Sequence, residues 1–208
     1  MKKSTLQLLL AAFGLIAGDA MAQQQSAAQS PWLVRARAVH ISPANESAPI
    51  GGVGAADRLH VSEKTIPEVD ISYFFTPNLA AELVLTYPQK HDVTLDGANI
   101  GTFKHLPPTL SAQYHFMPGA TVQPYVGAGV NYTTMSKVNL LGGAASLEHA
   151  SWGLSLQAGV DFRLNQNWSL NVDAKKVRIR SDVFIAGARA SSVNVDPVLL
   201  GIGLGYRF

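Results

Sequence analysis

The chain has 208 residues, of which 47% are hydrophobic and only 14% are charged, and its formal net charge is +2. This composition predicts one folded domain and excludes a disordered chain. The small net charge excludes an extended basic surface for nucleic acid. The absence of cysteine excludes disulfides and thiolate metal sites.

The N-terminal segment has the features of a secretory signal peptide. Met1–Lys3 carries positive charge, Leu8–Ala17 is an apolar run, and Ala20–Ala22 is a small-x-small cleavage pattern. The apolar run is shorter than the about 20 residues that a membrane-spanning helix needs. We therefore expect a cleaved leader at residues 1–22, followed by a single exported domain at residues 23–208.

Apolar and polar residues alternate along the mature chain with the period of a β-strand. The clearest segment is 151–164, where Trp152, Leu154 and Leu156 begin a row of six apolar residues on one parity. Glycine and polar residues occupy the other parity. Eight such segments follow in chain order: 32–41, 67–75, 79–87, 110–116, 125–132, 151–164, 168–179 and 198–208.

Two of these segments alternate less regularly than the others. Residues 32–41 carry Arg35 and Arg37 on one parity, and residues 168–179 lose the alternation at Lys176. We expect a β-bulge near Lys176, because one extra residue would restore the parity beyond it.

The connections between the segments alternate in length. Short turns are expected at 76–78, 117–121 and 165–167, and long loops at 42–65, 88–106, 134–150 and 181–194. Short periplasmic turns and longer extracellular loops are typical of an outer-membrane barrel. Aromatic residues also fall mostly at strand ends on the apolar parity, as interfacial girdles do.

These patterns predict an all-β fold, an eight-stranded antiparallel transmembrane β-barrel of the Gram-negative outer membrane. A soluble β-sandwich or lipocalin-like barrel would also alternate, but it would turn its apolar face inward. The aromatic positions favour the membrane barrel.

Ten charged residues share the lumen parity of the expected barrel. An eight-stranded lumen is filled by side chains, and buried charges persist only when they are paired, so we expect a charge network that fixes the register and seals the periplasmic end. A proton or ion relay is the alternative role. The residues are Arg35, Arg37, Glu68, Asp70, Glu82, Asp161, Arg163, Asp173, Lys175 and Arg207.

No catalytic or metal site is expected. Glu68 and Asp70 could form an acid/base pair, but no nucleophile accompanies them. His149 and Ser151, as base and nucleophile, could form half of the triad of a lipid-modifying enzyme, but the parity of the neighbouring strand places them away from lipid. The remaining histidines have no ligand spacing, so we expect them at the rim or in solvent. They are His40, His60, His91, His105 and His115. No enzyme activity and no cofactor are therefore predicted.

Four motifs in order resemble the OmpW family of outer-membrane proteins. They are His105–Leu110 (HLPPTL), Pro124–Thr134 (PYVGAGVNYTT), Ser151–Gly153 (SWG) and the ending Asp196–Phe208. The resemblance runs from Trp32 to the last residue. It implies an eight-stranded barrel with a narrow, largely hydrophobic lumen that passes small apolar molecules and releases them sideways into the membrane.

The chain departs from the usual pattern of this family in two places. Its long loops are shorter than is usual in the family, especially 181–194. Tyr87–Asp92 reads YPQKHD, where relatives usually carry an apolar or aromatic residue after the proline.

Pro88 lies where a long strand would continue above the membrane, and proline cannot donate a ladder hydrogen bond. With Pro107 and Pro108 opposite, it predicts an opening in the barrel wall, although an ordinary strand end would look the same. The expected gate and apolar path consist of Pro88, Leu106, Pro107, Pro108, Phe74 and Leu199, with Leu140, Leu141 and Leu147 as a funnel.

The leading hypothesis is passive uptake of small hydrophobic molecules, and the alternative is a structural, adhesive or receptor barrel with a closed lumen. Expected partners are outer-membrane lipid, small apolar solutes, and a phage or toxin at the loops. The outer-membrane assembly machinery is expected to read the C-terminal signature Ile202, Leu204, Tyr206 and Phe208.

Overall fold

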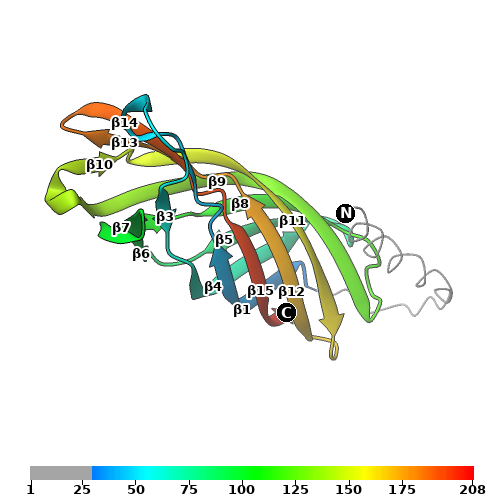
Figure 1. The fold of residues 1–208 in the computed structure, drawn as a ribbon. Helices are drawn as coiled ribbons and strands as arrows, with labels where there is room; N and C mark the ends of the chain where they lie inside the picture. Colours follow the sequence, from blue (N-terminus) through cyan, green and yellow to red (C-terminus); the bar gives the residue numbers. More distant parts are fainter. Residues whose placement is uncertain (1–29) are drawn as a thin grey trace, which may run out of the picture.

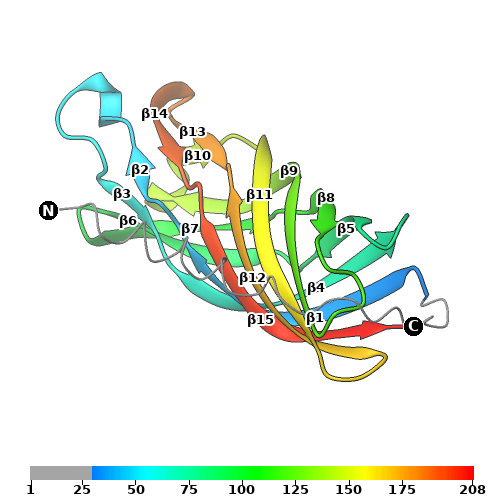
Figure 2. The same cartoon turned by 90° about the vertical axis from the view of Figure 1, so that its right-hand side faces the viewer.

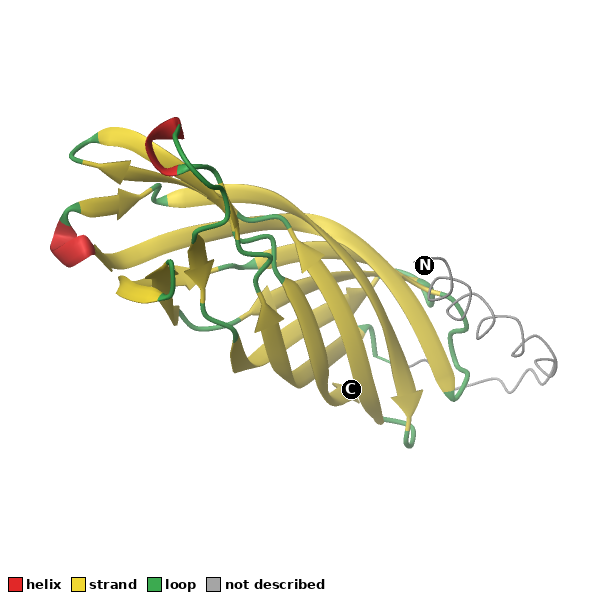
Figure 3. Cartoon of the chain, viewed as in Figure 1, coloured by secondary structure: helices red, strands yellow, loops and turns green. Residues whose placement is uncertain are grey.

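The computed structural model describes residues 30–208, so the expected leader at 1–22 lies outside the described residues. The described chain forms fifteen β-strands and two single-turn 3-10 helices, η1 (Ile50–Gly52) and η2 (Leu141–Gly143) (Figure 3). Within residues 30–208, no helix is both long enough and apolar enough to cross a membrane.

Eight strands form a closed antiparallel barrel, which confirms the predicted fold class (Figure 1). Each strand pairs with the next around the barrel, and the pairing of β9 with β11 and of β1 with β15 closes the ring. The barrel strands are β1 (Trp32–Ser42), β4 (Lys64–Phe74), β5 (Leu79–Leu85), β8 (Thr109–His115), β9 (Val122–Leu140), β11 (Ala150–Arg163), β12 (Trp168–Val177) and β15 (Val198–Arg207).

The apolar parity faces outward. On β11, Trp152 and Leu156 are 72% and 65% exposed, whereas Ser155 and Gln157 are buried in the lumen. A water-soluble barrel would reverse this arrangement. In hydrocarbon, a closed ladder satisfies every backbone polar group while the outward side chains meet lipid.

Aromatic side chains gather at both ends of the outward apolar band. Edge-on contacts join Trp32 to Tyr73 and Trp168 to Tyr206, with ring centroids 4.9 and 5.0 Å apart. Tyr132 lies against Trp152 at the other end, at 4.6 Å. Amphipathic rings of this kind mark the level of the lipid headgroups.

The four long connections are not loops but a second tier of strands above the barrel (Figures 1 and 2). Their ladder runs in the order β3-β6-β7-β9-β10-β13-β14-β2, with β9 continuing upward from the barrel. The added strands are β2 (Glu46–Ser47), β3 (Leu59–Val61), β6 (Gln89–Leu95), β7 (Ala98–Leu106), β10 (Ala145–Leu147), β13 (Arg180–Ile185) and β14 (Ala188–Asn194).

The two ends of this ladder, β2 and β3, lie in the same connection of the chain and are joined by hydrogen bonds. The backbone N–H of Ser47, on β2, donates to the Asp57 carboxylate at 2.8 Å, and the backbone N–H of Leu59, on β3, donates to the Ser47 hydroxyl at 3.3 Å. The N–H of Val61 donates to the Asn45 side chain at 2.7 Å. The upper tier is therefore a continuous rim rather than four independent loops.

The expected bulge at Lys176 is wrong. Lys176 pairs in register with Leu156 on one side and Val198 on the other, with no shift in either ladder. The alternation continues because Lys175 points into the lumen while Lys176 is exposed. Register shifts occur instead in the upper tier, for example between Val183 and Phe184.

Candidate functional site

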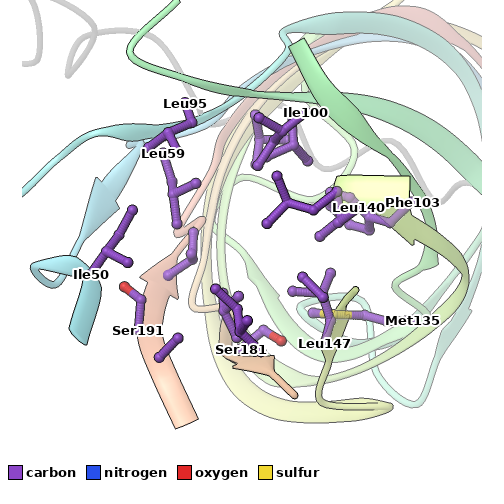
Figure 4. Close-up of a pocket in the computed structure, with 18 of the residues that line it drawn as sticks. Ile50, Leu59, Leu95, Ile100, Phe103, Met135, Leu140, Leu147, Ser181 and Ser191 are labelled. Atoms are coloured by element: carbon purple, nitrogen blue, oxygen red, sulfur yellow. The ribbon is translucent and has the colours of Figure 1, made fainter. Parts of the chain in front are cut away.

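The rim encloses an apolar cavity of about 100 Å³. Its lining comes from almost every strand of the upper tier, and the side chains point toward one shared interior space (Figure 4). Inward residues such as Val93, Met135 and Val183 are nearly fully buried. The short strands position them because successive side chains of a strand point to opposite faces, so that every second residue faces the interior.

The predicted funnel residues belong to this cavity. Leu140, Leu141 and Leu147 all line it, together with Leu59 and Phe103, which sequence reasoning did not single out. Those two were missed because their strands are too short for a clear alternation pattern.

A smaller chamber of about 30 Å³ lies between the apolar cavity and the charged side chains that fill the barrel lumen. Its walls are mixed: Ile41, Val84 and Leu199 are apolar, whereas His105 and Lys175 are polar. Val177 and Ile179 lie between the chamber and the cavity above, because they line the chamber and also belong to the apolar cluster of the rim.

The barrel wall beside this chamber is not fully paired. The β5–β8 ladder ends at the pair Val84 and Thr109, and pairing resumes above at Gln89 and His105. Thr86–Pro88 therefore belongs to no strand. The upper half of β4 is paired with β1 alone from Lys64 to Glu68, so the wall is weakly hydrogen-bonded on both sides of Pro88.

The predicted gate residues divide into two groups. Pro88, Pro107 and Pro108 lie at the unpaired wall, and Leu199 lines the chamber inside it. Leu106 instead lies on the outward parity of β7, with Lys104.

Phe74 was wrongly placed on the apolar path. It packs with Leu33 and Ala80 at the opposite end of the barrel, beneath the charge network, and the Arg207 guanidinium lies 4.0 Å from its ring centre. Parity correctly predicted that Phe74 faces the lumen, but it carries no information on depth along the lumen.

Below the chamber, charged side chains fill the lumen. Arg35 is fully buried, and its Nη2 lies 2.7 Å from the Asp161 carboxylate while its Nη1 lies 3.2 Å from Asp70. Arg37 Nη2 lies 2.8 Å from Asp70 and 2.9 Å from Glu68. Arg35 thus bridges carboxylates on β4 and β11 across the lumen, and Arg37 joins two carboxylates of β4.

Neutral polar groups complete the network. Gln113 and Gln157 donate amide N–H bonds to Glu82 at 2.7 and 3.1 Å, and the Tyr125 hydroxyl donates to Asp173 at 2.7 Å. Tyr125 can cross the lumen because residue 159 is glycine; a Cβ there would lie 2.4 Å from the tyrosine ring.

Eight of the ten predicted charges meet in this network, and two do not. Lys175 reaches Glu82 at 3.5 Å, but Arg163 and Arg207 make no ion pair within residues 30–208. Arg163 donates to the Gly119 carbonyl and Arg207 to that of Ser30, both at the periplasmic mouth. Their positions as the last residues of β11 and β15 are the signal that could have placed them there.

The histidines were predicted at the rim or in solvent. This is wrong for His115, which lies in the barrel lumen on β8, whereas His91 and His105 do lie in the rim, but on its inner face. His91, His105 and His115 are buried, with exposures of 1%, 7% and 1%. Within the described part of the chain, no three His, Cys, Asp or Glu side chains are placed to hold a metal ion. Ser151, weighed as a nucleophile, accepts the Arg180 backbone N–H at 3.3 Å.

Comparison with known proteins agrees with this architecture. The OmpW family model matches residues 29–208. The chain belongs to the OmpW family. Outer membrane protein W of Escherichia coli is 32% identical, with the whole of both chains covered. The crystal structure of the outer membrane protein OprG from Pseudomonas aeruginosa superimposes with a TM-score of 0.76 at 28% identity, covering 86% of this chain and 97% of that one.

A third relative is the dibenzothiophene metabolism operon protein PahQ of Pseudomonas aeruginosa, 26% identical over 88% of this chain and 90% of that protein. These matches confirm the resemblance seen in the motifs and show an outer-membrane barrel. Such barrels are generally not enzymes.

Proposed function

We propose that this OmpW-family barrel is a passive channel for small hydrophobic molecules. The solute enters the apolar cavity of the rim, reaches the chamber below it, and leaves sideways into lipid through the wall at Thr86–Pro88. The observation that carries the proposal is an apolar cavity above a floor closed by ion pairs, with the weakly paired wall between them. The operon name of the relative PahQ agrees with an apolar aromatic solute.

The closed floor explains why the exit would be lateral. Arg35 and Arg37 with their carboxylates occupy the lumen, and an apolar solute cannot displace buried, paired charges without a large free-energy cost. The path of lowest cost turns toward the hydrocarbon that surrounds the barrel. No energy source is needed, because the solute moves from water into lipid.

The rival function is an adhesive or receptor barrel with a closed lumen. Uptake separates the two, measured in proteoliposomes whose outer leaflet contains lipopolysaccharide. Pro88→Ala restores a backbone N–H at the weakly paired wall. One regained hydrogen bond of about 1 kcal/mol would lower the fraction of barrels with an open wall about five-fold. Uptake of an apolar solute should fall accordingly, whereas Pro118→Ala in a periplasmic turn should leave it unchanged.

A second variant tests the entrance. Ala145→Phe fills the cavity from β10 and should reduce uptake, while Ala188→Phe at an exposed hairpin tip should not. Uptake by the unmodified protein no faster than in protein-free vesicles would reject the channel and favour the closed barrel.

We also propose that the outer-membrane assembly machinery binds the C-terminal strand. Ile202, Leu204 and Phe208 are exposed on the outward face of β15, where a partner can reach them before the barrel closes.

A further inference from the structure

Three buried hydrogen-bonding atoms beside the chamber and the cavity have no partner in the described chain. They are Gln89 Oε1, His91 Nε2 and His105 Nδ1. Gln89 and His105 are directly opposite on β6 and β7, and His91 is the next inward residue on β6. Gln89 and His105 line the lower chamber, and Phe103, beside both histidines, lines the upper cavity. The cluster therefore lies between the two spaces.

At least two of these atoms can only accept a hydrogen bond. His91 Nδ1 lies 2.8 Å from the Ser62 carbonyl oxygen; a carbonyl accepts, so Nδ1 carries the hydrogen and Nε2 is bare. Gln89 Nε2 donates to the Tyr87 carbonyl at 2.9 Å, which leaves Oε1 as an acceptor. Burial also lowers the pKa of His91, and lowers that of His105 to about 3, so both rings are neutral at physiological pH.

The rings form an aromatic wall beside these acceptors. His91 and His105 have centroids 4.8 Å apart, and Phe103 lies 5.9 and 6.0 Å from them. The two imidazole planes differ by only 31°, and within residues 30–208 no three His, Cys, Asp or Glu side chains are placed to hold a metal ion. A flat apolar molecule with a single donor group fits such a wall better than a cation does.

We propose that this cluster selects neutral, apolar-bodied solutes that carry one hydroxyl or N–H donor, such as phenols and indoles, over hydrocarbons of the same shape. The inference rests on the proposed channel function and names its solute class. A buried acceptor left unpaired is costly, whereas a paired one is not. A hydrocarbon that displaces water from the cluster leaves the acceptors unpaired, and a phenol pairs one of them.

The test compares p-cresol with p-xylene, which differ by replacement of a methyl group by a hydroxyl. The double variant Gln89→Leu with His105→Phe removes two of the three unpartnered polar atoms and keeps an aromatic ring at position 105. We expect the ratio of p-cresol to p-xylene uptake to fall about five-fold, the factor that corresponds to one hydrogen bond of about 1 kcal/mol. His60→Phe, at an exposed histidine of β3, is the matched control and should leave the ratio unchanged.

A second readout reports on the cluster directly. In the 15N-labelled protein in micelles, p-cresol should shift the unprotonated imidazole nitrogens of His91 or His105, whereas p-xylene should not. The shift between heated and unheated gel mobility confirms that each variant is folded.

The outcomes separate the two proposals. If neither solute enters faster than in protein-free vesicles, the channel function fails. If both enter, but the ratio is the same in the unmodified protein and the double variant and the nitrogens do not respond, the channel stands and the selectivity is overturned.

Discussion

Arg35 shows how a single residue can hold a barrel together from inside. Its guanidinium is fully buried and bridges Asp161 on β11 and Asp70 on β4, with a further bond to the Ser72 hydroxyl at 3.1 Å. Removal of the cation would leave these carboxylates uncompensated in a low-dielectric interior.

We therefore expect Arg35→Met to lower the free energy of unfolding by about 3–5 kcal/mol, the usual cost of breaking a buried pair from one side. Arg163→Met, at the mouth and outside the ion pairs, should change it by less than about 1 kcal/mol. Urea titration of the barrel in micelles, followed by tryptophan fluorescence, measures both. Equal midpoints for the two variants would contradict a stabilising role of the network.

At this scale the sequence predicted which side chains enter the lumen but not their depth. Alternation placed Phe74 and Leu199 on the same face, yet the first lies at the periplasmic mouth and the second lines the chamber. Depth depends on strand tilt and register, which alternation within one strand cannot reveal.

The β6–β7 hairpin is the element on which the pH should act. It extends above the outward apolar band, and its outward residues are polar, as Lys90 opposite Lys104 illustrates. Its inward histidines are neutral because burial lowers their pKa. Lys64 lowers the pKa of His91 further, whereas Asp92 raises it. His91 and Lys64 both lower the pKa of His105.

The hairpin should lose stability as the pH falls. An unfolded histidine takes up a proton near pH 6.5, whereas folded His105 does so only near pH 3. Below about pH 6.5 the unfolded hairpin therefore binds more protons, and the free energy of opening decreases until about pH 3. Hydrogen exchange of the β6–β7 amides at pH 7 and pH 5, corrected for intrinsic rates, measures the change.

In His91→Phe with His105→Phe, the protection of these amides should no longer depend on pH over this range. Protection in the unmodified protein that is equal or greater at pH 5 would contradict the expectation.

The upper tier is also the part of the fold that the sequence predicted least well. The eight barrel strands were recognisable because lipid exposes one long parity, as on β11. The connections 88–106 and 181–194 were expected to be loops, but they form β6–β7 and β13–β14. Their strands are short, and register shifts such as that at Val93 and Thr94 interrupt the alternation, so no long pattern existed to detect.

For the whole molecule, closure depends on the last strand. β15 pairs with β12 along one edge and with β1 along the other, so the barrel has free edges until the C-terminus is placed. Deletion of Phe208 should lower the amount of folded protein in the outer membrane several-fold while leaving the refolding of purified chain in micelles nearly unchanged.

Cell fractionation and unheated gel mobility measure the first quantity, and refolding yield measures the second. Phe116→Ala, an outward aromatic on a periplasmic turn, is the control for the loss of a lipid-facing ring. Parallel losses in the cell and in micelles would assign Phe208 to folding alone and reject its recognition by the assembly machinery.

The continuous rim constrains where this surface protein can lengthen. One residue added within β10, β13 or β14 would shift the pairing register beyond it, and this shift would turn cavity-lining side chains out to water. The bends at 51–54, 97, 142–143 and 187 lie beyond the last strand pairs, and each of their glycines has a positive φ angle. These four points can therefore carry a foreign epitope into the medium while the interior keeps its shape, which makes the hairpins a natural display scaffold.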